Sequence, residues 1–170
     1  MKLQNLCDNS QKLITSYQLL KLLSEISEEI KNFLNLQKLG YVATVSSDGT
    51  PNISPKGTII GWSKNQLAFA DIRSPDTMQN LKTNPNVEIN VIDPLLRKGF
   101  LFKGSAQILQ NTPLYDEILK HYRDNGIKSP INSIVLVDVT EISEVISPLY
   151  DLGIEEDEIK SKWKKHFESL

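Results

Sequence analysis

The sequence predicts an α+β fold that is mainly β: a small antiparallel barrel of about six strands with a helix at each end of the chain. Short β-rich segments follow one another and are joined mainly by hairpin turns. Both chain ends carry apolar residues at helical spacing. Strict alternation of strands and helices is missing, which argues against a doubly wound parallel sheet.

The N-terminal part of the chain is expected to form an arm and then a helix. Residues 1–17 are polar and weakly patterned, so we expect an arm before a single domain that spans residues 18–170. From Leu19 to Leu34, apolar residues recur at helical spacing with charged residues between them. This pattern predicts one amphipathic helix that lies on a core.

A β-hairpin is expected next. Tyr41–Val45 is strand-like, and Ser47–Thr50 reads as a turn in which Gly49 adopts a positive φ. The return strand is expected to run from about Asn52 to Gly61. It contains Pro55, which cannot donate a backbone hydrogen bond, so we expect an edge position or a bulge there.

The segment after this hairpin predicts a strand and a short helix. Leu67–Asp71 is β-rich. Ser74 is a favourable N-cap, and Pro75 suits the first helical position, where a missing N–H costs nothing. Asn84 and Pro85 are expected to end the helix.

The rest of the chain predicts three more strands and two more helices. The long strand has Gly104 as its weak point, where we expect a bend. The last helix carries its acidic residues first and its lysines later, which suits the helix dipole. The strands are expected at Val87–Ile92, at Phe100–Leu109 and from Ile134 through Ile146, and the helices from Pro113 to Asn125, capped by Thr112, and from Glu155.

Composition limits the classes of protein that fit. The chain has 170 residues, of which 39% are hydrophobic and 24% charged, which favours one soluble domain. The net charge of -2 gives no basic surface for nucleic acid. A signal peptide and a membrane-spanning segment are not expected, so the predicted location is cytoplasmic. Cys7 is the only cysteine, which excludes an internal disulfide.

Common catalytic motifs are missing from the sequence. His121 and His166 lie on separate expected helices without acidic or cysteine partners at ligand spacing, so no metal site is predicted. The nucleophile elbow of hydrolases, the P-loop and the dinucleotide-binding glycine motif are also missing. No catalytic residue is assigned from these patterns.

Three loops of the β-rich half combine cations with residues that permit close approach to the backbone. They are Ser54–Gly57, the helix start at Arg73–Thr77, and Arg97–Phe100. The unpaired amides and the dipole of a helix start attract anions. A capped helix that binds nothing is the alternative for the second loop. Together the three loops favour a phosphorylated planar cofactor.

In order and spacing, these loops resemble the pyridoxamine 5′-phosphate oxidase-like family of FMN-binding split barrels. The resemblance covers about residues 23–168 and implies a six-stranded antiparallel split β-barrel that assembles as a homodimer. Two FMN molecules would lie at the subunit interface, and each site would also admit a small-molecule substrate. The matching segments are Leu39–Val45, Asp48–Pro51, Ser54–Gly57, Phe69–Ser74, Thr77, Asn80–Leu81, Asn84–Pro85, Asp93–Pro94, Arg97–Phe100 and Lys103–Gly104.

The resemblance also implies roles for individual residues. We hypothesise that Lys56 or a backbone amide near the ring would stabilise the negative charge of the reduced flavin. The residues beside the flavin ring are Ser54, Pro55, Lys56 and Gly57, and those at the edge of the ring or the ribityl chain are Ala70, Asp71 and Ile72. The residues at the phosphate are Arg73, Ser74 and Thr77, and those contributed by the partner subunit are Lys98, Gly99 and Phe100.

The sequence departs from the family pattern in two places. Asp76 stands at the helix start where many flavin-binding members have a basic residue. The C-terminal segment lacks the arginine and histidine residues with which true pyridoxamine phosphate oxidases hold their substrate, so vitamin synthesis is not expected. The leading hypothesis is an FMN-dependent oxidoreductase. The alternatives are a deazaflavin-dependent reductase and a cofactor-free or haem-handling binding protein on the same barrel.

Overall fold

The computed structural model describes residues 25–170 of the chain. The expected arm at residues 1–17, the first part of the expected helix and Cys7 lie outside the described residues. In chain order the elements are α2 (Glu28–Gln37), β1 (Gly40–Val45), β2 (Pro51–Lys56), β3 (Ile60–Gly61), β4 (Gln66–Asp71), α3 (Pro75–Thr83), β5 (Asn86–Asp93), β6 (Lys98–Leu109), α4 (Pro113–Asp124), β7 (Ser133–Ile146) and α5 (Glu156–Glu168).

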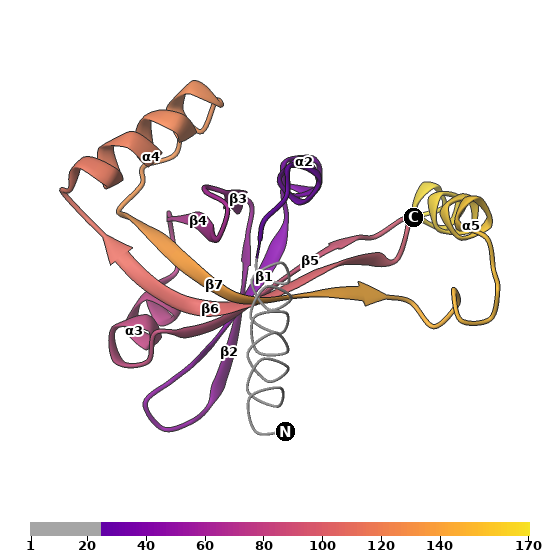
Figure 1. The fold of residues 1–170 in the computed structure, drawn as a ribbon, viewed down its shortest axis with the longest axis horizontal. Coiled ribbons are helices and arrows are strands. Elements are labelled where there is room, and N and C mark those ends of the chain that lie inside the picture. The colour runs from indigo at the N-terminus through magenta and orange to yellow at the C-terminus, as the bar shows by residue number, and fades with distance from the viewer. Residues whose placement is uncertain (1–24) are drawn as a thin grey trace, which may run out of the picture.

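The strands form one curled antiparallel sheet in the order β2-β1-β5-β6-β7-β4-β3, which confirms the mainly β fold class (Figure 1). The sheet has seven strands rather than six. The expected return strand at residues 52–61 is two strands, because β2 pairs with β1 whereas β3 pairs with β4 at the opposite edge. Residues 57–59 therefore cross from one edge of the sheet to the other.

The expected bend in the long strand β6 is confirmed. The pairing of β6 with β7 shifts register between Lys103 and Gly104. A Cβ atom on Gly104 would meet the backbone oxygen of Asp138 at 2.3 Å, so only glycine permits this approach. The bend lets β6 and β7 curl around the core as they follow the barrel.

Hydroxyl side chains start two of the helices. Ser27 accepts a hydrogen bond from the Ile30 amide (3.2 Å) at the start of α2, so the single helix expected from Leu19 to Leu34 is wrong at residues 25–27, which are not helical. The backbone amide of Ile26 instead donates to the Lys64 carbonyl. Thr112 accepts from the Tyr115 amide (3.1 Å), as expected for α4.

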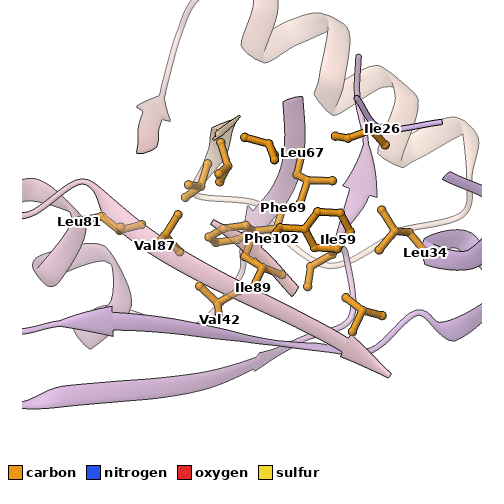
Figure 2. Packing of buried hydrophobic residues seen from close by; sticks show 14 of the residues in the cluster. Ile26, Leu34, Val42, Ile59, Leu67, Phe69, Leu81, Val87, Ile89 and Phe102 are labelled. Carbon is orange, nitrogen blue, oxygen red and sulfur yellow. The ribbon is translucent and has the colours of Figure 1, made fainter. Parts of the chain in front are cut away.

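The main core lies inside the curl of the sheet, under α2 and α3. Phe102 of β6 is at its centre, packed with Phe69 and Ile89 (Figure 2). A second cluster lies under α4, where Ile118 and Tyr122 cover β4 and β7. Figure 1 shows α4 and α5 at opposite ends of the sheet. None of the helices in the described part of the chain combines the length and apolarity needed to span a membrane.

Candidate functional site

Two of the three loops selected from the sequence meet in one cleft of about 250 Å³. One wall is the crossing segment that follows β2, and the other is the turn between β4 and α3. The pairing of β4 with β7 and of β2 with β1 holds these walls in place. The lining residues are Pro55, Lys56, Gly57, Thr58, Ala70, Ile72, Arg73 and Ser74.

Thr58 joins the two walls of the cleft, and no sequence pattern pointed to it. Its hydroxyl accepts a hydrogen bond from the Ala70 amide (3.0 Å), and its carbonyl accepts one from the Tyr122 hydroxyl (2.9 Å). Burial raises the pKa of Tyr122 well above its usual range, so this phenol stays a donor. A contact across 64 residues leaves no local signal in the sequence.

Lys56 places a nearly buried cation in the wall of the cleft. Only 6% of the residue is exposed. Its ammonium donates to the Ser54 hydroxyl and to the Pro55 carbonyl (3.5 Å), and among residues 25–170 no carboxylate forms an ion pair with it. Burial lowers the pKa of Lys56, and the charge of Asp71 opposes that shift. A cation this poorly solvated is well suited to meet an anionic group.

The start of α3 forms the other side of the cleft and differs from expectation. Ser74 holds the N-cap position and Pro75 the first helical position, but the Ser74 side chain does not cap the helix. Its hydroxyl donates instead to Asp71 (2.9 Å). Arg73 is exposed and lines the cleft, whereas Asp76 is exposed in the first turn without lining it.

Three other residues selected from the sequence lie beside the cleft rather than in its lining. Asp71 is 7% exposed and accepts hydrogen bonds from Ser74 and from Ser133 of β7 (3.4 Å). Thr77 is buried in the first turn of α3. Ser54 is half-buried beside the Lys56 ammonium.

The third loop lies elsewhere on the chain. Lys98, Gly99 and Phe100 line a separate groove of about 660 Å³ between α2, the start of β6 and the end of β7. Gly99 packs closely against the backbone of Val91, because a Cβ atom on Gly99 would clash with the Val91 carbonyl oxygen. Phe100 packs edge-on against Phe33, with ring centroids 5.3 Å apart.

The C-terminal segment holds the third loop in place, which the sequence patterns did not indicate. Glu156 of α5 pairs with Lys98 and raises the pKa of that lysine. The Tyr150 hydroxyl donates to the Leu96 carbonyl (2.7 Å). The Arg97 guanidinium lies 4.2 Å from the centre of the Trp163 ring. These partners are more than fifty residues apart in sequence, as the Lys98–Glu156 separation of 58 shows.

The histidines do not join either cavity as a metal centre. His121 packs edge-on against Trp62, and His166 against Trp163. No group of three or more metal-ligating side chains occurs in the described residues.

The fold and the cleft match a known family. The sequence profile of a family described as pyridoxamine 5′-phosphate oxidase matches residues 26–146. The chain belongs to this family. The profile ends where β7 ends, so the α5 segment follows the part of the chain that the family profile covers.

Solved structures show the same fold. HupZ of Group A Streptococcus is 28% identical, with a TM-score of 0.65 over 72% of this chain and 95% of that one. An FMN-binding protein from Syntrophomonas wolfei is 17% identical, with a TM-score of 0.63 over 84% of this chain and 98% of that one. An F420 reductase is 26% identical, with a TM-score of 0.53 over 69% and 98%. No curated protein sequence matches this chain.

Proposed function

We propose that the protein binds FMN in the cleft between β2 and α3 and acts as an oxidoreductase on a small organic or nicotinamide substrate. One observation carries the proposal: the nearly buried cation of Lys56 lines the same cleft as Ser74, the N-cap residue of α3, whose side chain does not cap that helix. Both features favour an anion. Membership of the pyridoxamine 5′-phosphate oxidase family supports FMN as the source of that anion.

The residues around the cleft fit the parts of FMN. Arg73 and the first turn of α3 would hold the phosphate, with Thr77 behind them. Ala70 and Ile72 offer apolar contacts for the ribityl chain and the ring edge. Lys56 would lie at the ring and stabilise added negative charge. Bound flavin supplies hydride or single-electron transfer, and the protein contributes binding, orientation and electrostatics.

A second copy of the chain would complete the site. The cleft, at about 250 Å³, is smaller than the roughly 300–1,000 Å³ of ordinary cofactor pockets. The groove at Lys98–Phe100 shares no lining residue with the cleft. In the homodimer that we propose, this groove of the partner covers the cofactor and leaves room for a substrate.

The visible absorption spectrum of the purified protein tests the proposal. We expect twin flavin bands and release of FMN when the protein is heated. Protein that lacks FMN as isolated and does not take it up from excess cofactor would contradict the proposal. Size-exclusion chromatography with light scattering on the same sample tests the homodimer.

A deazaflavin is the second candidate cofactor. The 26% identity to an F420 reductase favours it over other planar cofactors. Parallel titrations of cofactor-free protein with FMN and with F420 distinguish the two, because each absorbs differently. If F420 binds more tightly than FMN, F420 becomes the proposed cofactor and the proposed site stays the same.

Asp76 is expected to weaken FMN binding. This exposed carboxylate lies in the first turn of α3, where it repels a phosphate dianion. We expect Asp76→Lys to strengthen FMN binding by about 1–2 kcal/mol, the size of a charge-assisted contact. Isothermal titration calorimetry measures the change.

Asp116→Lys is the matched control for this substitution. Asp116 is an exposed acid in the first turn of α4 and is not part of the cleft lining. The Asp116→Lys substitution should leave FMN binding unchanged. An unchanged affinity in Asp76→Lys would mean that Asp76 points away from the phosphate, and it would favour a cofactor-free binding protein if the wild type also binds weakly.

A further inference from the structure

Three helices of the described chain begin at a serine or threonine, and one of these residues does not cap its helix. Ser27 accepts from the amide of Ile30, and Thr112 accepts from the amide of Tyr115, in each case three positions further on. The corresponding pair in α3 is Ser74 and Thr77, and no such bond forms there. The first helical position of α3 is Pro75, which has no amide hydrogen.

Asp71 accounts for the missing cap. The Ser74 hydroxyl donates to one Asp71 carboxylate oxygen at 2.9 Å, and the other oxygen accepts from the Ser133 hydroxyl at 3.4 Å. All three residues are buried. Asp71 and Ser133 are also register partners in the β4–β7 pairing, so the carboxylate is fixed to the sheet.

Because the Ser74 hydroxyl donates to Asp71, backbone amides at the start of α3 have no side-chain acceptor. The first intrahelical bond runs from the Met78 amide to the Ser74 carbonyl. The amides of Asp76 and Thr77 precede it, and no side chain among residues 25–170 accepts from them. Such amides are the donors that a bound phosphate uses at a helix start.

We propose that Asp71 is a positioning residue that holds the Ser74 hydroxyl away from the helix and so keeps the amides of Asp76 and Thr77 available to the cofactor phosphate. This inference rests on the proposed function. Asp71 itself does not line the cleft and acts through Ser74. The Lys56 ammonium feels the charge of Asp71, so the same carboxylate also supports the cation of the cleft.

The test compares binding of FMN with binding of riboflavin, which has the same ring without the phosphate. In Asp71→Ala the freed Ser74 hydroxyl is expected to cap the helix and compete with the phosphate, which lowers the preference for FMN over riboflavin about fivefold, the size of an ordinary N-cap. Asp71→Asn also lacks the charge but keeps an oxygen that accepts from Ser74. It should retain the wild-type preference.

The double variant separates this role from a merely structural one. Adding Ser74→Ala to Asp71→Ala removes the competing hydroxyl, so the FMN preference should return toward the wild-type ratio. A structural role predicts further loss instead. An unchanged preference in Asp71→Ala, or no recovery in the double variant, would overturn the proposal.

Amide hydrogen exchange tests the same inference without any cofactor. In the wild type, the Asp76 and Thr77 amides should exchange faster than the capped Tyr115 amide of α4, and Asp71→Ala should slow them. Equal protection in wild type and variant overturns the role of Asp71.

If neither FMN nor riboflavin binds the wild type, the proposed function fails, while this exchange pattern still decides the position of the Ser74 hydroxyl. The comparison of Thr77 with Tyr115 uses wild-type protein alone and holds even if Asp71→Ala fails to fold.

Discussion

Replacing Phe102 with alanine is expected to lower the free energy of unfolding by about 3–5 kcal/mol, which is the usual cost of deleting a buried aromatic ring. Phe102 is 1% exposed and lies on β6 between Ile89 of β5 and Ile142 of β7. The surrounding strands pair on both sides of it, so they cannot move inward to fill the cavity. Denaturant unfolding followed by circular dichroism measures the loss.

Leu152→Ala is the control for the Phe102 substitution. Leu152 is 75% exposed in the turn before α5, so its truncation should change stability by less than about 0.5 kcal/mol. A Phe102→Ala variant that loses no more stability than this control would contradict the central place of Phe102 in the core (Figure 2).

Local features of the fold follow from residues that are close in sequence. Gly49 has φ 86° in the β1–β2 turn, as the Asp-Gly pair indicates. Thr112 caps α4, and Gly104 marks the bend of β6. Each of these was predictable because it depends mainly on the conformational preference of one or two residues.

The division of residues 52–61 into β2 and β3 depends on the whole sheet and was missed. The composition of this segment suits a strand throughout. The segment is split because the chain crosses here from one edge of the sheet to the other. The place of the second edge is fixed by the pairing of β4 with β7. Periodicity carries no information on that pairing.

The candidate site shows the same contrast. The sequence pattern alone predicted residues in both walls of the cleft, because cationic residues, a glycine and a helix start rarely occur together. It also predicted Ser74 as the N-cap of α3. Ser74 holds that position, but its hydroxyl does not cap the helix because it donates to Asp71 instead. The bond from Ser133, 62 residues away, helps to fix that carboxylate and is invisible in the local sequence.

Lys56→Met is expected to lower the midpoint potential of bound FMN by roughly 30–60 mV. Reduction adds negative charge to the flavin, and a hydrogen bond from a charged donor contributes about 1.5–3 kcal/mol, which for a two-electron couple converts at about 30 mV per 1.4 kcal/mol. Lys56 is 6% exposed, so water replaces its charge poorly. Potentiometric titration with a reference dye measures the shift, and Lys128→Met, an exposed lysine outside the cleft lining, should leave the potential unchanged.

The pH dependence of this shift identifies Lys56 as its source. Burial lowers the pKa of Lys56, so its cation is lost as pH rises, at a lower pH than for an ordinary lysine. The potential difference between wild type and Lys56→Met should therefore be full at pH values below the lowered pKa and disappear as pH rises through it. A difference that persists into the range where ordinary lysines titrate would mean that the variant changes the packing of the cleft rather than its charge. Because Asp71 opposes the pKa shift, Asp71→Asn should move the disappearance to still lower pH, which connects the cation of the cleft to the carboxylate that positions Ser74.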